Sequence, residues 1–458
     1  MPPQSASVLR GQSVAVNVQV SLIACFAHEI TVTLGTVADI SAPPATIGSG
    51  QTATTLTISA ASSAQLGNVT VPIGFTGGGK SHTAQLDLLV REVAGTLDQT
   101  FTVHSSGPGA VAALGVAPDG KIWVASNSTT GGAGWKLERL NADGTPDTFS
   151  PPALPNTGGV RDLVRASNGQ IVLAGDVSGG VALVRMNSNG VADAVLGANG
   201  TYMLPAANFP TTISASALAV QLDDKPVVAA NWVGNGVVAR VDPGQSSLPV
   251  PPGKVDLQAS LAGANLSSVM LSSGRIVVAG TNNSHVFLAA RLNTTGDADT
   301  TFGTNGSTSY AAGAYEHVRD GVVTSNGIYL SGAIQGGADV YPALFRFNLD
   351  GGSAAHTQHN PPGAYNYSYA GIAAQSDGKL VVVGSGGTSA SGYRSVLTRF
   401  NPDGSIDETF APDQTPKGSR VFQIGGNTFM STVAIAPDGR IIVGGSSPSG
   451  GTVARFWP

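Results

Sequence analysis

The sequence QSDGKLVVVG, residues 375–384, places a glycine turn directly before a short run of β-branched residues. Six related stretches occur, with Asp224 replacing the glycine in the third: APDGKIWVAS (117–126), ASNGQIVLAG (166–175), QLDDKPVVAA (221–230), LSSGRIVVAG (271–280), TSNGIYLSGA (324–333) and APDGRIIVGG (436–445). Successive turns lie 49 to 61 residues apart. Self-similarity at this period indicates a repeat architecture, so function is expected in residues that depart from the repeat.

A second signature, an arginine followed by an asparagine and a glycine turn, lies downstream in each unit. The best copies are RLNADGTPDTF (139–149), RLNTTGDADTTF (291–302) and RFNPDGSIDETF (399–410). Asn and Asp beside Gly favour tight hairpin turns, so these turns require neither calcium nor substrate. Each interval accommodates four short strands, the size of one propeller blade. Residues 94–458 are therefore predicted to form a seven-bladed β-propeller.

The two ends of this region complement one another. The chain stops at ARFWP (454–458), before any D-x-T-F segment, and GTLDQTF (95–101) supplies that segment at the front. We expect a strand at about residues 95–105 to complete the last blade. This pairing would close the propeller and remove the exposed edges of an open sheet.

Residues 1–93 show a different pattern, in which apolar and polar residues alternate, as in Val14, Val16, Val18 and Val20. Alternation with a period of two predicts strands with one buried face. Turn-rich breaks separate these strands. We therefore expect an immunoglobulin-like sandwich of about seven antiparallel strands, which makes the whole chain all-β.

Two resemblances support this organisation. The DGKI-V-V-AG and R-N-DG-S-D-TF elements resemble the delta-60 repeat of large bacterial surface and secreted proteins. The stretch 47–90 resembles the bacterial immunoglobulin-like domains that are appended to such proteins as spacers or stalks, and this resemblance covers nearly all of residues 5–91. The resemblances imply a surface or secreted location and imply no particular activity.

Composition narrows the function classes. Charged residues make up 11% of the chain, the net charge is −5 and no basic stripe occurs, which argues against nucleic acid as a partner. Cys25 is the only cysteine, so neither an intrachain disulfide nor a cysteine-based metal cluster is expected. No apolar run is long enough to predict a membrane span. The low charge is typical of exported bacterial proteins, and we expect an extracellular or cell-surface location, with any export signal already removed, and no cofactor.

One candidate site consists of two acidic residues. Arg161-Asp162 and Arg319-Asp320 stand at equivalent positions before their turn glycines, on the strand expected to line the central channel. An aspartate pair facing across a channel could act as acid and base in glycoside hydrolysis. The structural alternative is an Arg-Asp pair that seals the channel mouth.

A second candidate site is aromatic, because five of the nine tyrosines crowd the segments entering the fifth and sixth units. Flat rings with polar edges stack on sugars, while amide and imidazole groups bond hydroxyls. With the two arginines, the candidate ligand-binding residues are Tyr310, Tyr315, His317, Tyr365, Asn366, Tyr367, Tyr369, Arg161 and Arg319. The alternative is that the tyrosines cap strand ends.

The absence of G-x-S-x-G and H-E-x-x-H motifs removes two common hydrolase signatures. His356 and His359, in a Gly/Pro-rich loop, lack the supporting carboxylates of a metal site. We therefore expect a non-enzymatic adhesion module that binds a surface glycan or a protein. The alternatives are a polysaccharide hydrolase or lyase using Asp162 and Asp320, and a structural spacer within a larger surface assembly.

Overall fold

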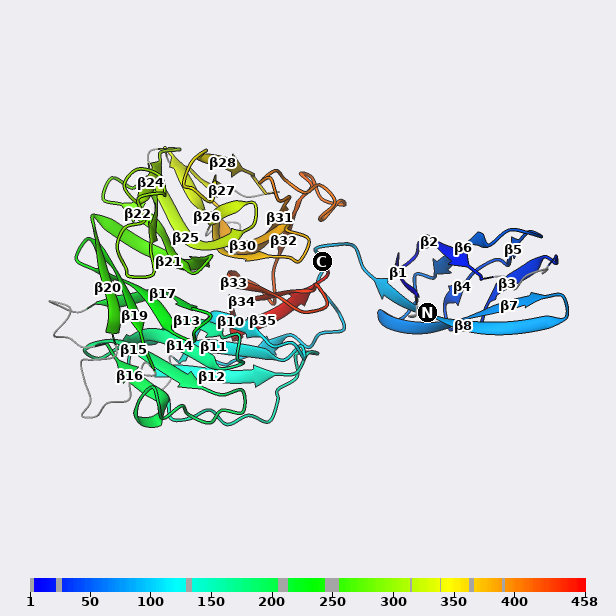
Figure 1. Ribbon diagram of the computed structural model, residues 1–458, viewed down its shortest axis with the longest axis horizontal. Coiled ribbons are helices and arrows are strands. Elements are labelled where there is room, and N and C mark those ends of the chain that lie inside the picture. The colour runs from blue at the N-terminus through cyan, green and yellow to red at the C-terminus, as the bar shows by residue number, and fades with distance from the viewer. Residues whose placement is uncertain are drawn as a thin grey trace. The chain divides into compact units, whose positions relative to one another are not determined.

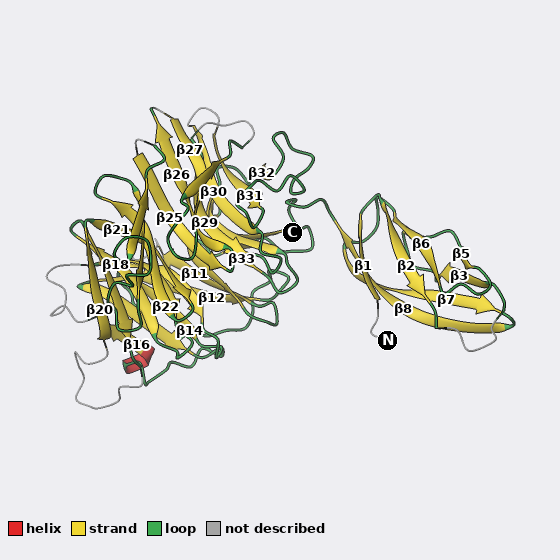
Figure 2. Cartoon of the chain, turned by 45° about the horizontal axis from the view of Figure 1, so that its top comes forward, coloured by secondary structure: helices red, strands yellow, loops and turns green. Residues whose placement is uncertain are grey.

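The computed structural model describes residues 4–21, 27–128, 134–204, 213–243, 255–313, 315–337, 339–361, 366–388 and 392–458. Within these ranges the chain is β structure joined by turns, apart from the 3₁₀ turn η1 (Ala198–Gly200), which confirms the all-β class (Figure 2). The chain divides into two compact units, Met1–Thr100 with Trp457 and Phe101–Phe456 with Pro458. Across the described ranges, no helix is long and apolar enough to cross a membrane.

The first unit contains two sheets. The larger has the order β1-β8-β7-β3-β5 and the smaller the order β2-β6-β4, and β1 runs parallel to β8. The strands are β1 (Gln4–Leu9), β2 (Ser13–Gln19), β3 (Ile30–Leu34), β4 (Ile40–Ser41), β5 (Ala45–Ile47), β6 (Ala53–Ala60), β7 (Gly67–Gly77) and β8 (Lys80–Arg91).

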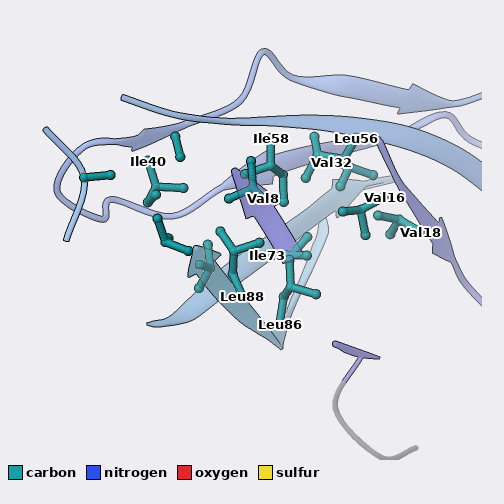
Figure 3. Close-up of a cluster of buried hydrophobic side chains, with 14 of the residues drawn as sticks. Val8, Val16, Val18, Val32, Ile40, Leu56, Ile58, Ile73, Leu86 and Leu88 are labelled. Atoms are coloured by element: carbon teal, nitrogen blue, oxygen red, sulfur yellow. The ribbon is translucent and has the colours of Figure 1, made fainter. Parts of the chain in front are cut away.

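Both sheets of the first unit contribute to one apolar core (Figure 3). Val16 and Val18 of β2 and Leu86 and Leu88 of β8 are buried, while the residues between them are exposed. The expected period of two is therefore present in these strands. Burial on one face of each strand joins the two sheets.

The described part of the second unit forms seven sheets. In chain order, their strands are β10 (Val111–Val116), β11 (Ile122–Ser128) and β12 (Gly134–Leu140); β13 (Gly159–Arg165), β14 (Ile171–Val177), β15 (Gly180–Met186) and β16 (Thr201–Met203); β17 (Ser214–Val220), β18 (Pro226–Trp232), β19 (Asn235–Val241) and β20 (Val255–Ala262); β21 (Ala264–Ser272), β22 (Arg275–Asn282), β23 (Phe287–Leu292) and β24 (Ser307–Tyr310); β25 (Tyr315–Thr324), β26 (Gly327–Gly336), β27 (Asp339–Phe347) and β28 (Ala355–Gln358); β29 (Ser368–Ala374), β30 (Leu380–Thr388), β31 (Gly392–Phe400) and β32 (Ser419–Phe422); and β33 (Phe429–Ile435), β34 (Ile441–Ser447), β35 (Gly450–Phe456) and β9 (His104–Ser105).

The first strand of each sheet lies beside the first strand of the next. Contacts run from β10 to β13, β17, β21, β25, β29 and β33 in turn, and β33 also contacts β10. Figure 1 shows the first strands that it labels, β10, β13, β17, β21, β25 and β33, toward the middle of the unit, with β16, β20, β24 and β28 toward its periphery. The first strands therefore surround a common centre, and each has one edge without a paired strand.

The last sheet takes its fourth strand from the beginning of the unit. Ser105 and His104 of β9 pair with Thr452 and Val453 of β35. The strand expected at about residues 95–105 is thus much shorter than predicted. Asp98 explains the difference, because its Oδ1 accepts hydrogen bonds from the N–H and hydroxyl of Thr100, at 2.9 and 2.7 Å, and so forms a turn.

In four of the units the repeated arginine and aspartate pair, as their spacing suggests. The Nε or Nη2 atom of the arginine lies 2.6 or 2.7 Å from an aspartate Oδ2, in Arg139–Asp147, Arg185–Asp193, Arg291–Asp299 and Arg399–Asp407. Three of these arginines, Arg139, Arg185 and Arg291, also reach the following sheet. Arg291, for example, donates to the carbonyl of Leu349 at 2.6 Å. Arg455 of β35 donates in the same way to the carbonyl of Ala142, joining the last sheet to the first.

Candidate ligand-binding site on strand β25

All seven first strands carry a β-bulge at an equivalent position. A bulge adds one residue to a strand and re-aims its side chain. The bulged residues are Ala112, Arg161, Ser216, Ser267, Arg319, Ala370 and Ser431. Five of these residues are small, so the two arginines are the exceptions in an otherwise uniform ring of positions.

Arg161 is held by a carboxylate of its own sheet. Its Nε and Nη2 donate to Oδ2 of Asp176 at 2.8 and 2.7 Å. Oδ1 of Asp176 also accepts the N–H of Ala215 in the next sheet at 2.8 Å. Arg161, which the sequence placed in the ligand site, is therefore engaged internally and is not part of the site described below.

Arg319 has no such carboxylate. In the register of its sheet, Ala333 pairs with His317 as Asp176 pairs with Gly159, so alanine occupies the position equivalent to Asp176. No carboxylate or hydrogen-bond acceptor of the described residues contacts the Arg319 side chain. The guanidinium is exposed and free to meet an anion.

Arg319 belongs to a row of exposed polar side chains on β25. Tyr315, His317 and Arg319 are exposed, whereas Glu316 and Val318 between them are buried. Tyr315 is 48% exposed, which leaves much of its ring open to solvent. The strand thus presents an aromatic ring, an imidazole and a guanidinium in sequence.

His285, from the turn between β22 and β23, joins this row from the preceding sheet. Its ring centroid lies 4.9 Å from that of Tyr315 and 6.4 Å from that of His317. Partial burial lowers the pKa of His317, and the positive charges of Arg319 and His285 lower it further. We call Tyr315, His317, Arg319 and His285 the β25 site.

The buried Glu316 fixes the beginning of β25. Its Oε2 accepts the N–H of Phe287 in β23 at 2.9 Å. Its Oε1 accepts the N–H of Gly313 at 2.8 Å and also that of Ala312. Glu316 therefore ties the segment that leads into the site to the neighbouring sheet.

Asp162 and Asp320, the proposed acid–base pair, are engaged with backbone. Asp162 accepts the N–H groups of Leu163 and Leu218, at 2.7 and 2.8 Å. Burial, with the charge of Asp320 as a smaller contribution, raises the pKa of Asp162 to about 7. Burial likewise raises the pKa of Asp320 to about 6. Arg161 binds Asp176 instead of Asp162, so the expected Arg161-Asp162 pair at the channel mouth is not formed.

The other candidate residues are not gathered at the β25 site. Tyr367 and Tyr369 are only 1% and 0% exposed and pack in the core around β30, so their rings offer no free face to a ligand. The hydroxyl of Tyr310 lies 3.0 Å from Nδ1 of His356. Oδ1 of Asn366 accepts the N–H of Val340 at 2.8 Å. Tyr365 lies outside the described residues.

Sequence reasoning missed His285 and the significance of Ala333. His285 follows a turn in TNNSHVF (281–287), and nothing local distinguishes it from a surface histidine. Its contact with Tyr315 depends on the packing of two sheets. Among the described residues, no group of three or more His, Cys, Asp or Glu side chains could hold a metal ion.

Comparison with known proteins concerns the fold. The model of a family described as a β-propeller domain of unknown function, DUF5122, matches residues 117–149, 166–194, 271–302 and 375–410. These segments contain both signatures of four repeats. The protein is thus a β-propeller protein. Among curated proteins, none matches the sequence significantly.

Solved structures with similar folds are distant. A quinonprotein alcohol dehydrogenase-like protein from Bacteroides thetaiotaomicron is 9% identical, with a TM-score of 0.40, over 92% of this chain and 96% of that chain. A DUF4623 family protein from Bacteroides eggerthii is 10% identical, with a TM-score of 0.35, over 92% and 87%. The endosialidase of phage phi92 is 10% identical, with a TM-score of 0.32, over 84% and 63%. At these scores the similarities carry no argument about function.

Proposed function

We propose that the protein is a non-catalytic binding module of the bacterial exterior, in which a propeller binds a surface glycan or a protein through the β25 site. The observation that carries this proposal is the exposure of Tyr315, His317 and Arg319 on one strand, with the guanidinium lacking an internal partner. Exposed aromatic and arginine side chains are the residue types most enriched at binding hot spots.

The architecture we propose for this module is a seven-bladed propeller, preceded by an immunoglobulin-like stalk. Seven sheets with adjacent first strands support the blade count. The pairing of β9 with β35 and the bond from Arg455 to Ala142 support closure of the last blade on the first. The two-sheet core of the first unit supports the stalk assignment. The low content of charged residues, 11%, supports an extracellular location.

A binding screen tests the proposal. The purified protein is incubated with a panel of bacterial and host polysaccharides and with surface proteins, and bound ligand and any reducing-end or unsaturated product are recorded together. Saturable binding without product is expected, and Tyr315→Ala should weaken it without lowering the unfolding temperature. Unchanged binding by Tyr315→Ala would reject the β25 site, and silence across the panel would favour a structural spacer.

The second candidate function is a polysaccharide hydrolase or lyase that uses Asp162 and Asp320. It is favoured by their pKa values of about 7 and about 6, since a carboxyl with a raised pKa can act as a general acid. If the screen yields product, an Asp162→Asn, Asp320→Asn variant should lose turnover. Product formation at the wild-type rate by this variant would eliminate the two residues as catalysts.

A further inference from the structure

Building on the proposed function, we propose that the β25 site recognises a carboxylate and that its ligand is an acidic polysaccharide whose sugar acid pairs with Arg319. Two sheets with corresponding strand order and bulges differ at one position. Arg161 and Arg319 occupy the same bulge position, yet only Arg161 has a carboxylate beside it, that of Asp176.

The missing polar side chain is specific to one sheet. The position of Asp176 is polar in the six other sheets and bonds to the next sheet in several of them, as when Asn231 accepts the N–H of Leu266 at 2.7 Å. Its occupants are Asn127, Asp176, Asn231, Thr281, Ser385 and Ser446, and Ala333 is the exception. The sheet that exposes Arg319 is thus the one that lacks a polar side chain there.

The histidines near Arg319 leave its charge uncompensated. The ring centroids of His317 and His285 lie 6.4 Å apart, and neither side chain pairs with a carboxylate among the described residues. The two nearest carboxylates in sequence bond to backbone instead: Asp320 accepts the N–H groups of Gly321 and Ile372, and the buried Glu316 accepts three others. A guanidinium can bind a carboxylate through two parallel hydrogen bonds. Arg161 shows that an arginine at this bulge can donate from both Nε and Nη2, there to the single Oδ2 atom of Asp176.

A sugar acid fits this site better than an acidic side chain of a protein. Tyr315 offers an exposed ring face against which the apolar face of a sugar can stack. Four steps along a strand separate Tyr315 from Arg319, roughly 13 Å at about 3.3 Å per residue. One rigid sugar acid carries both an apolar face and a carboxylate, and a polymer of such units can contact both ends of the row at once.

Titration calorimetry with a polyuronate and with the same polymer after reduction of its carboxyl groups tests the inference. The wild-type protein should bind the polyuronate at least about tenfold more tightly than the reduced polymer, as expected for a charge-assisted hydrogen bond. Arg319→Ala should lose this preference. Arg161→Ala, which removes the equivalent but internally paired arginine, should keep it. Ala333→Asp places a carboxylate at the position that corresponds to Asp176, and this variant should also lose the preference. Thermal unfolding verifies that each variant is folded.

The outcomes separate the inference from the proposed function. Equal binding of the acidic and reduced polymers, or a preserved preference in Arg319→Ala, would overturn carboxylate recognition while leaving a glycan-binding module. Tighter binding of poly-L-glutamate than of any polyuronate would overturn the assignment to polysaccharides in favour of an acidic protein. Absence of binding to every polymer and protein tested would overturn the proposed function as well.

Discussion

Asp162 and Asp320 lie directly after their bulges, and each joins two neighbouring sheets. Asp162 of β13 accepts the N–H of Leu218 in β17, and Asp320 of β25 accepts the N–H of Ile372 in β29, at 2.8 and 3.2 Å. Each also accepts the N–H of the residue that follows it in its own strand. This geometry makes the two carboxyls links between adjacent sheets.

The raised pKa of Asp162 predicts a dependence of stability on pH. The folded protein holds the proton more tightly than the unfolded chain, because the pKa is about 7 when folded and about 3.9 in an unfolded chain. The contribution of this group is therefore fully present below about pH 4 and is lost as the pH rises toward 7. Relative to Asp162→Asn, the wild type should lose on the order of 2–4 kcal/mol of unfolding free energy over this range.

Urea denaturation at pH 4 and pH 7 measures this difference. Tryptophan fluorescence is a suitable probe, because three of the four tryptophans, at 123, 135 and 232, belong to the second unit. Other titratable groups change the unfolding free energy with pH in the opposite direction. They are the same in wild type and variant, so comparing the two proteins cancels their contributions. Asp407 is one of these, since Thr409, Lys379 and Arg399 together outweigh burial and lower its pKa to about 2. Parallel pH profiles for wild type and variant would contradict the prediction.

At the scale of the strand, Glu316 determines where β25 begins. Replacing it with alanine leaves the N–H groups of Ala312, Gly313 and Phe287 without their acceptor, at a cost of about 3–5 kcal/mol. We expect Glu316→Ala to lower the unfolding temperature and to weaken ligand binding, although Glu316 is buried and contacts no ligand. Glu316→Gln, which retains one acceptor oxygen, should restore part of both. Full-strength binding by Glu316→Ala, measured by calorimetry, would show that the site does not depend on this anchor.

The elements that the sequence predicted well are those in which local pattern and packing agree. The glycine turn and the β-branched run of 375–384 lie where the repeat places them, at the start of β30. Prediction was poorer where a side chain redirects the backbone, as Asp98 does. It was also poorer where a strand begins earlier than expected, as β29 does at Ser368. Tyr369 belongs to β29 and is buried by adjacent strands. The residues beside it in sequence did not indicate this burial.

The β25 site was predictable only in part for a related reason. Tyr315, His317 and Arg319 are close in sequence and could be identified together. His285 lies 30 residues before Tyr315, and Asp176 lies in another sheet from Ala333. Their importance depends on register and on contacts between sheets, which no local pattern encodes.

At the scale of the whole molecule, residues from the beginning of the second unit complete its last sheet. Phe101 is 5% exposed, and the Arg455 guanidinium lies 4.9 Å from the centre of its ring. Ser106 adds a backbone hydrogen bond to Gly451 at 2.7 Å. A segment distant in sequence thus covers the edge of β35, which would otherwise present unpaired backbone groups.

Two truncations test whether this segment stabilises the propeller. Residues 94–458 retain Phe101 and β9, so their unfolding, followed by tryptophan fluorescence, should match that of the full chain. Residues 107–458 lose both, and removal of one buried phenylalanine alone costs about 3–5 kcal/mol. The unfolding midpoint of the shorter fragment should therefore fall by about 5–10 °C. Phe101→Ala in the full chain should reproduce much of this fall, because it removes the ring against Arg455 and keeps the β9 pairing. If the shorter fragment unfolded at the same temperature as the longer one, the last sheet would be stable with three strands, and the pairing of β9 with β35 would be dispensable for stability.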